Sequence, residues 1–418
     1  MLRYQIEGGK KLEGEVCVSG SKNASLPIIA ASIMNKGITR LSNVPNIHDT
    51  KVMLEILSVL GCKIKKKNGK IVIDARNLKS YQIPEPLMRE MRSSVILAGA
   101  LLAVHKEALF SYPGGCDIGA RPIDLHLEGF RKLNIQIEEA AGDIHCYYDD
   151  IIGNEISLDF PSVGATENIM LASVFAKGKT VIKNAAMEPE ITDLANFLNK
   201  MGANILGAGT NEITIQGVTK LKNVSYTIMP DRIEAGTLLC AVANTGGKAK
   251  ITKAKPEHIT PVLHKLEECG CHIETGEDWI SIIGPKRLKA VDIKTMPYPG
   301  FPTDMQSVFA SILTTAKGSS MVVENIFENR YKYASELMRM GAKITIEGRT
   351  AVIKGVKGLS GATVKSTDLR GGASLVVAAL RAKGKTTIEQ IGYILRGYEN
   401  LEKKLQSLGA NIQIVEGD

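Results

Sequence analysis

Two kinds of helical pattern alternate along the chain. One kind is apolar on nearly every face, as in SKNASLPIIAASIM and DLRGGASLVVAAL, and such helices are expected to be buried on all sides. The other kind is amphipathic, as in RYKYASELMRM and YENLEKKLQSL. Short extended stretches such as VIKNA and KITKA, bounded by glycine-bearing or polar turns, separate the two kinds. The pattern therefore predicts a mixed α/β protein.

A short motif shows that this alternation repeats. The end of a helix, a small residue and a strand that begins with isoleucine recur as LGCKI, LNIQI, MGANI, CGCHI, MGAKI and LGANI, and their second positions lie 68 to 73 residues apart. Five of these positions are glycine and the sixth is Asn134, the two residue types that best tolerate a left-handed backbone at a helix C-terminus. Units of this length are too long for a solenoid, whose repeats span roughly 20–50 residues. We interpret the chain as two domains of three similar units each.

Every unit presents two loops, one before its apolar helix and one before its amphipathic helix. We expect these loops to meet in one place and to carry the chemistry of the protein, because binding and catalytic residues gather on loops. The loops before the amphipathic helices hold, in chain order, His48-Asp49, Cys116, Glu188-Pro189-Glu190, Glu257-His258, Glu328-Asn329-Arg330 and Leu395-Arg396.

Composition narrows the classes of function. The chain has 418 residues, a net charge of +8 that is spread along its length, and only 5% aromatic residues. A nucleic-acid-binding protein would show a basic stripe with stacking aromatics, whereas a cleft for an anionic small molecule fits this charge. The N-terminus has no apolar signal region, and no stretch approaches the roughly 18 apolar residues of a membrane span. We therefore expect a soluble cytoplasmic protein with no membrane partner.

The cysteines give no sign of a disulfide framework or a metal centre. The seven cysteines form no CxxC pair, and Cys269-Gly-Cys271 is too closely spaced for a structural zinc site. We expect reduced thiols, no metal and no cofactor. Cys116 is unusual because it lies in SYPGGCDIGARP, where glycines permit a tight turn and Arg121 would favour a thiolate. An incidental cysteine in a turn explains this peptide equally well.

Longer motifs in the chain resemble those of a known family. SGSKNASLPIIAASIM, PGGCDIGARPIDLH, DFPSVGATENIM, PGFPTDMQ, VENIFENRY and TDLRGGASL with RGYE closely resemble motifs of bacterial UDP-N-acetylglucosamine enolpyruvyl transferases (1-carboxyvinyltransferases). The resemblance runs from about residue 4 to residue 415. It implies the enolpyruvyl transferase fold: two inverted α/β barrel domains, each of three similar units of about 70 residues. By analogy, one domain spans 22–229 and the other spans 1–21 and 230–418, with the active site in the cleft between them.

The resemblance also implies a reaction. The family transfers the enolpyruvyl group of phosphoenolpyruvate to the 3′-hydroxyl of UDP-N-acetylglucosamine and releases phosphate, which is the first committed step of peptidoglycan synthesis in the cell wall. Cys116 matches the family's proton donor to C3, which can also be captured as a covalent adduct. Asp304 matches the aspartate beside the attacking hydroxyl, as general base or orienter. Lys22 and Asn23 match phosphoenolpyruvate contacts, and Arg396 reaches the same substrate.

The remaining residues carried over would bind the UDP-sugar or neutralise charge. Planar guanidinium groups suit carboxylates and phosphates, and a helix N-terminus such as that after Ser162 favours a phosphate. Phe160 and Tyr393 depart from the lysine and histidine of some family members, which affects the nucleotide contacts and the Arg396 loop. The residues concerned are Arg92, Arg121, Pro122, Ile123, Asp124, Leu125, Ser162, Val163, Gly164, Asp304, Ile326, Arg330 and Arg370.

Simpler interpretations stay open for several of these residues. Asp231, Asp304 and Asp368 stand at helix starts, where aspartate most often acts as an N-cap. Arg330 and Arg370 could pair with acidic neighbours across the cleft. Lys22 at a helix start opposes the helix dipole, which favours an anion partner over a solvated lysine.

Two other functions are compatible with the fold. One is that of 5-enolpyruvylshikimate-3-phosphate synthase, whose site has no loop cysteine equivalent to Cys116 and no GARPIDLH motif. The other is that of a catalytically silent paralogue that binds the UDP-sugar and regulates cell-wall synthesis. The joint presence of Lys22, Cys116, Asp304 and Arg396 argues against the silent paralogue, because a binding protein needs no proton donor. The sequence leaves the oligomeric state undetermined.

Overall fold

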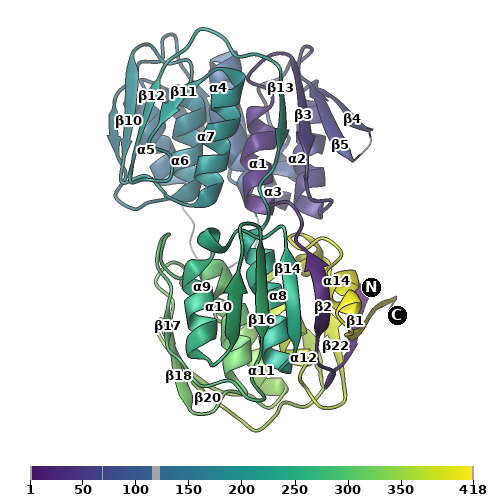
Figure 1. Cartoon of the computed structure of the whole chain (residues 1–418). Coiled ribbons are helices and arrows are strands. Elements are labelled where there is room, and N and C mark those ends of the chain that lie inside the picture. The colour runs from purple at the N-terminus through teal and green to yellow at the C-terminus, as the bar shows by residue number, and fades with distance from the viewer. Residues whose placement is uncertain (1, 68, 115–122, 417–418) are drawn as a thin grey trace. The chain divides into compact units, whose positions relative to one another are not determined.

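The computed structural model describes residues 2–67, 69–114 and 123–416 (Figure 1). The described residues form two compact units. The central unit comprises residues 20–114 and 123–229, and the terminal unit comprises residues 2–19 and 230–416. Each has its own hydrophobic core. Cys116, Arg121 and Pro122 lie outside the described residues.

Each unit contains three sheets built on one plan. An edge strand pairs in parallel with the strand that follows the apolar helix, and a hairpin continues the sheet on its other side in antiparallel pairing. In the second sheet of the central unit, a single parallel bridge from Gln82 to Leu109 stands in place of the edge strand. The sheets of the central unit are β13 (Val224–Thr227), β3 (Ile38–Ser42), β5 (Lys70–Asp74) and β4 (Lys63–Lys67); β6 (Glu107–Ser111), β8 (Asp143–Tyr147) and β7 (Gln136–Ala140); and β9 (Glu155–Ser157), β10 (Lys179–Lys183), β12 (Glu212–Gln216) and β11 (Asn204–Leu206). Those of the terminal unit are β2 (Glu13–Cys17), β14 (Lys248–Thr252), β16 (Trp279–Ile283) and β15 (His272–Thr275); β17 (Ile293–Lys294), β18 (Ser319–Val323), β20 (Thr350–Lys354) and β19 (Lys343–Glu347); and β21 (Thr363–Lys365), β22 (Lys385–Glu389), β1 (Leu2–Glu7) and β23 (Asn411–Glu416).

The two predicted kinds of helix are both present. In each unit the apolar helices pack against one another inside the sheets (Figure 1), and α12 is buried along its whole length. The apolar helices are α1 (Lys22–Ala31), α4 (Leu97–His105, after a 3-10 helix Arg92–Ile96), α6 (Val163–Ser173), α8 (Arg232–Thr245), α10 (Thr303–Leu313) and α12 (Leu369–Ala379). The amphipathic helices are α2 (His48–Val59), α5 (Asp124–Lys132), α7 (Pro189–Met201), α9 (Thr260–Glu268), α11 (Tyr333–Arg339) and α14 (Leu401–Ser407). Short helices α3 (Glu85–Glu90) and α13 (Gly392–Leu395), and a 3-10 turn Pro256–His258, lie in the connections.

The small residue of the repeated motif has the expected backbone in all six copies. The five glycines have φ between 95° and 110°, and Asn134 has φ 66°. A residue with a β-branched or large side chain would be strained in this left-handed region. The motif therefore marks the end of each amphipathic helix and the start of the hairpin that follows it.

Two repeats exchange their first strands. β2 precedes α1 in sequence but pairs with β14 of the terminal unit, and β13 precedes α8 but pairs with β3 of the central unit. The chain changes unit at these two points, between residues 19 and 20 and between residues 229 and 230. Within the central unit the Ser21 N–H donates to the Met229 carbonyl at 2.8 Å, and within the terminal unit the Asp231 N–H donates to the Ser19 carbonyl at 2.9 Å. The exchange keeps every sheet within one unit, so neither core depends on strands from the other.

Candidate functional site

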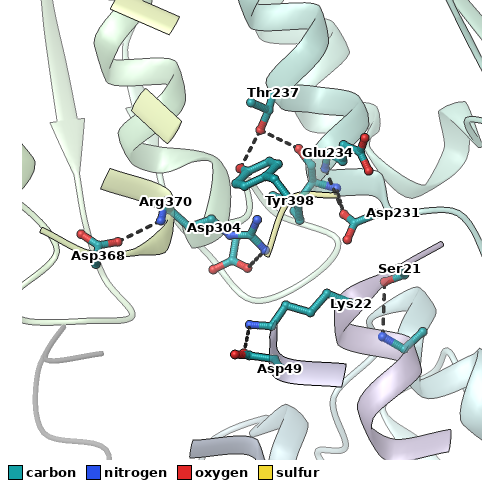
Figure 2. A network of polar contacts seen from close by, with 12 residues as sticks. Ser21, Lys22, Asp49, Asp231, Glu234, Thr237, Asp304, Asp368, Arg370 and Tyr398 are labelled. Carbon is teal, nitrogen blue, oxygen red and sulfur yellow. Dashed lines mark hydrogen bonds and ion pairs between the residues drawn. The ribbon is translucent and has the colours of Figure 1, made fainter. Parts of the chain in front are cut away.

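Lys22 occupies the first position of α1, in the central unit. Ser21 is the N-cap, and its hydroxyl accepts a hydrogen bond from the Ala24 N–H at 3.3 Å. The Lys22 ammonium pairs with the Asp49 carboxylate at 2.9 Å (Figure 2), where Asp49 is 1% exposed and Lys22 14%. Asn23 follows on the same turn and is half-buried. The anion expected beside Lys22 is thus a carboxylate of the protein, and an incoming anionic substrate would share the ammonium with Asp49.

A second helix start in the central unit offers hydrogen-bond donors. Ser162 is the N-cap of α6, and its hydroxyl accepts from the Ala165 N–H at 3.3 Å. Within the described residues the N–H groups of Val163 and Gly164, the first two residues of the helix, have no hydrogen-bond partner. Unpaired N–H groups at a helix N-terminus bind anions well, because the helix dipole adds to their partial charge.

The other residues expected to contact the nucleotide have different settings. Arg92 begins the 3-10 helix before α4 and is half-buried. Ile123 is buried, Leu125 is half-buried and Asp124 is exposed at the start of α5. Phe160, one of the two departures from the family pattern, is 42% exposed.

In the terminal unit, Asp304 is held between two arginines. Its Oδ1 lies 2.9 Å from Nη2 of Arg330 and its Oδ2 lies 2.9 Å from Nη2 of Arg370. The two guanidinium side chains are 3% and 5% exposed, whereas the aspartate is 26% exposed. Such a pair of cations stabilises the ionised carboxylate. The acidic partner of Arg330 and Arg370 is Asp304, which belongs to the same unit as the two arginines.

The pKa of Arg370 reports the same arrangement. Burial acts to lower it, but the charge of Asp304, with contributions from Tyr398 and Asp231, outweighs burial and raises the pKa above its ordinary value. The guanidinium also lies over the ring of Tyr398, 5.3 Å from its centre. The Tyr398 hydroxyl is within 2.9 Å of the Thr237 hydroxyl (Figure 2). Arg370 is therefore fixed by Tyr398 and by Asp304, and it holds the Asp304 carboxylate in one orientation.

Two of the three aspartates at helix starts are N-caps, and the third, Asp304, is not. Asp231 Oδ1 accepts from the N–H groups of Ile233 and Glu234 at 2.8 and 2.9 Å, so it caps α8. Asp368 caps α12 in the same way, through the N–H groups of Arg370 and Gly371. Asp304 is not a cap: the N-cap of α10 is Pro302, and Asp304 is the second residue of the helix. Its carboxylate is bound by side chains instead.

A buried glutamate missed in the sequence orders the loop of Ile326. Glu324 is 0% exposed, and its Oε1 accepts from the Ile326 N–H at 2.8 Å and from the Thr295 hydroxyl at 2.9 Å. Its Oε2 accepts from the hydroxyl of Thr303, the first residue of α10, at 3.0 Å. Glu324 therefore ties the Ile326 loop to the helix start that carries Asp304. The one local sign of the burial of Glu324 is its position directly after the apolar strand residues MVV, and this sign does not reveal its hydrogen-bond partners.

Arg396 and Tyr393 lie in or next to a short helix, and most of the described cysteines are buried. Arg396 follows α13 and is half-buried, and Tyr393 on the same short helix is 37% exposed. Of the described cysteines, Cys17 is exposed and the other five are buried, and burial raises the pKa of Cys62 and Cys269 to about 12. Burial makes such thiols inert. In the described ranges no cluster of histidine, cysteine and acidic residues could hold a metal ion. No helix in the described part of the chain has the length and apolar character of a membrane span.

A family model and several curated proteins are similar to this chain over nearly its full length. The family model of EPSP synthase (3-phosphoshikimate 1-carboxyvinyltransferase) matches residues 6–405. The chain is 56% identical to UDP-N-acetylglucosamine 1-carboxyvinyltransferase 2 of Caldanaerobacter subterraneus subsp. tengcongensis, over 99% of both chains. It is 52% identical to UDP-N-acetylglucosamine 1-carboxyvinyltransferase 1 of Symbiobacterium thermophilum, over 99% of this chain and 95% of the relative.

Solved structures agree on the fold. The enolpyruvyl transferase NikO from Streptomyces tendae matches with a TM-score of 0.89 at 24% identity, over 100% of this chain and 99% of that one. EPSP synthase from Acinetobacter baumannii matches with a TM-score of 0.76 at 20% identity, over 100% of both chains. At these identities the likeness shows the enolpyruvyl transferase fold alone, and it is the sequence relatives that narrow the family. The chain is an enolpyruvyl (1-carboxyvinyl) transferase and belongs to the family of UDP-N-acetylglucosamine 1-carboxyvinyltransferases.

Proposed function

We propose that the protein transfers the enolpyruvyl group of phosphoenolpyruvate to the 3′-hydroxyl of UDP-N-acetylglucosamine. The family membership supports this reaction, and the observation that carries it in this chain is Asp304, a half-buried carboxylate fixed by two buried arginines. The 3′-hydroxyl loses its proton, which passes to the solvent, as its oxygen bonds to C2 of phosphoenolpyruvate, and C3 gains a proton. The C2–O bond to phosphate then breaks and C3 loses a proton, which releases phosphate and restores the double bond.

Asp304 is best suited to orient the attacking hydroxyl. A carboxylate bound by two guanidinium groups is a weak base, because the charges that stabilise it also reduce its affinity for a proton. It nevertheless accepts a hydrogen bond well, and fixed positioning of a nucleophile lowers the barrier to its attack. Of the two roles expected for Asp304, orienter is therefore the one its contacts favour. Ile326 would lie against the UDP-sugar on the loop that Glu324 orders.

Anion binding would fall to two sets of residues. Lys22, Asn23 and Arg396 would hold the carboxylate and phosphate of phosphoenolpyruvate. For the nucleotide we propose Arg92, Ile123, Asp124, Leu125 and the start of α6 at Ser162, Val163 and Gly164, together with Arg121 and Pro122, which lie outside the described residues. Residues 22–229 and the remainder of the chain, 1–21 and 230–418, would then act as two domains that both contribute to one reaction.

Cys116, also outside the described residues, is proposed as the proton donor to C3. A thiol suits this role because its ordinary pKa of about 8.5 leaves it protonated at neutral pH, yet close enough to neutrality to give the proton up. Its support is the PGGCDIGARPIDLH motif and the contrast with the buried cysteines of the chain, whose pKa values are raised. Synthesis of peptidoglycan precursors for the cell wall, in the cytoplasm, is the biological role that this reaction implies.

The test is phosphate release by the purified protein with phosphoenolpyruvate. UDP-N-acetylglucosamine and shikimate 3-phosphate are compared as acceptors, for the wild type and Cys116→Ser. We expect release with the UDP-sugar only, and a loss of most of this activity in the variant. Fosfomycin, an epoxide that alkylates the family's cysteine, should add its mass to the peptide that contains Cys116, and an unmodified peptide would contradict the role of this thiol.

Other outcomes identify the alternatives. Release with shikimate 3-phosphate alone would establish the activity of an EPSP synthase. Tight binding of the UDP-sugar with no release from either acceptor would indicate a catalytically silent regulatory protein.

A further inference from the structure

The tautomer of His126 is set by a buried amide. His126 lies on α5 and is 7% exposed. The side chain of Asn168, on α6, is oriented by two backbone groups: its Oδ1 accepts from the Gly99 N–H at 2.8 Å, and its Nδ2 donates to the Val95 carbonyl at 2.9 Å. The same Nδ2 lies 2.8 Å from Nδ1 of His126. Since Nδ2 can only donate, Nδ1 must accept, and the proton of the neutral ring is on Nε2.

The ring stays neutral over the whole physiological range. Burial, with a further contribution from the positive charge of Arg92, lowers the pKa of His126 to about 3. A second proton at Nδ1 would also displace the hydrogen bond from Asn168. The imidazole therefore presents a permanent Nε2–H donor that carries no charge.

This donor lies at the start of α6. A methyl group placed on Gly164 would come within 3.0 Å of Cε1 and 3.2 Å of Nε2 of His126. The edge of the ring that carries the donor thus lies directly over the first turn of the helix, and glycine leaves room for it. Among the described residues, Nε2 of His126 has no hydrogen-bond partner, like the N–H groups of Val163 and Gly164. Three unsatisfied donors therefore meet at one helix N-terminus.

We propose that His126 is a nucleotide-positioning residue, whose neutral Nε2–H donates to an anionic oxygen of the diphosphate bound at the first turn of α6. The inference rests on the proposed function in that it takes the ligand to be a nucleoside diphosphate. A neutral donor suits this place because an imidazolium would be buried beside the charge of Arg92. Asn168 acts through His126: it fixes the tautomer and does not itself meet the ligand.

Two substitutions of His126 distinguish the effect of losing the Nε2–H donor from the effect of losing the packed ring. His126→Gln can place an amide N–H near the position of Nε2, whereas His126→Asn keeps an acceptor for Asn168 but is too short to reach the helix start. Calorimetric titrations with UDP, and ligand-observed NMR titrations with uridine, measure the contribution of the diphosphate in each protein. A hydrogen bond to a charged group gives an expected loss of about 10- to 100-fold in UDP affinity for His126→Asn. His126→Gln should stay within a few-fold of the wild type, and uridine affinity should change little in either variant.

The outcomes divide clearly. Wild-type UDP affinity in His126→Asn, or equal losses for UDP and uridine in both variants, would overturn the proposal. If His126→Asn does not fold, the wild type labelled with ¹⁵N-histidine decides: the His126 Nε2–H resonance should shift downfield with UDP and not with uridine, and no shift with UDP overturns the proposal. A protein that binds UDP in this way but transfers no enolpyruvyl group would refute the proposed function and leave the role of His126 intact.

Discussion

Two of the three apolar helices in each unit have a side-chain cap, and the caps differ between the units. In the central unit, α1 and α6 are capped by the neutral hydroxyls of Ser21 and Ser162, each of which accepts from one N–H. In the terminal unit, α8 and α12 are capped by the carboxylates of Asp231 and Asp368, each of which accepts from two. The repeats share one architecture, so this difference lies in the chemistry of the helix starts and not in the fold.

The difference suits the two units to different tasks. A serine cap leaves donors unpaired and the positive end of the helix dipole uncompensated, which favours an added anion. An aspartate cap satisfies the donors and cancels the dipole, so the helix start has no further need of an anion. The terminal unit instead uses two of its buried arginines, Arg330 and Arg370, to fix Asp304. The serine-capped helix starts of the central unit therefore suit the anion binding that we propose, whereas the terminal unit holds one carboxylate between two arginines.

The largest effect is expected from loss of that carboxylate. Asp304→Asn leaves a single acceptor oxygen for two guanidinium groups and for the sugar hydroxyl. We expect kcat to fall about 1,000-fold, within the range for groups that position or exchange protons in the transition state. Steady-state phosphate release measures this change.

Asp368→Asn is the matched control for this variant. Asparagine caps helices as well as aspartate does. Because Asp368 acts only as a cap, the activity of Asp368→Asn should stay within about threefold of the wild type. Similar losses in the two variants would mean that Asp304, too, matters chiefly for the structure of its helix.

A smaller effect should follow when the central unit is given the cap of the terminal unit. Ser162→Asp would place a carboxylate against the N–H groups of Gly164 and Ala165 at the first turn of α6 and repel the diphosphate. We expect the Kd for UDP-N-acetylglucosamine to rise about 10- to 100-fold, since charges a few ångströms apart near a surface interact by several kcal/mol. The melting temperature should not fall. Ser162→Asn, an equally good but neutral cap, should bind within a few-fold of the wild type; equal binding by both variants would refute the comparison.

Local patterns sufficed to predict part of this molecule. The six left-handed residues, including Asn134, and the buried helices follow from interactions within a few positions of the chain. The caps at Asp231 and Asp368 could be named for the same reason, because a cap is a contact over two or three residues. Such features need no knowledge of the tertiary structure.

What could not be predicted depends on residues far apart in sequence. Asn168 fixes His126 across 42 positions, and Lys22 finds Asp49 on another helix. The exchange of β2 and β13 leaves no local trace either, because both strands precede an apolar helix as in the other repeats. The residue types at helix starts therefore indicate where an anion could bind. The other side chains of such a site come from distant parts of the sequence, so only the folded structure shows them.

Two carboxylates with different partners give a last contrast between the units. Asp304 is stabilised by two cations, but the partners of Asp193 on α7 are neutral: it accepts from the Tyr226 hydroxyl at 2.7 Å and the Met229 N–H at 3.3 Å. Burial raises the pKa of Asp193 to about 6; these two hydrogen bonds oppose the shift, and the charge of Glu190 adds to it. An aspartate in the unfolded chain has a pKa of about 3.9. The folded protein therefore binds a proton more tightly at this site than the unfolded chain does.

The sign of the resulting pH effect is fixed by that difference. The stability associated with protonated Asp193 is fully present below about pH 4 and is lost as the pH rises to about 6, after which the deficit is constant at up to about 3 kcal/mol. Asp193→Asn keeps an acceptor for Tyr226 but cannot ionise, so it should raise the melting temperature of the central unit at pH 7.5 by several degrees, at about 2–4 °C per kcal/mol. This gain should shrink between pH 6 and pH 4. Calorimetric scans of wild type and variant across that range measure it, and a difference in melting temperature that stays constant with pH would mean that the fold does not raise the pKa of Asp193.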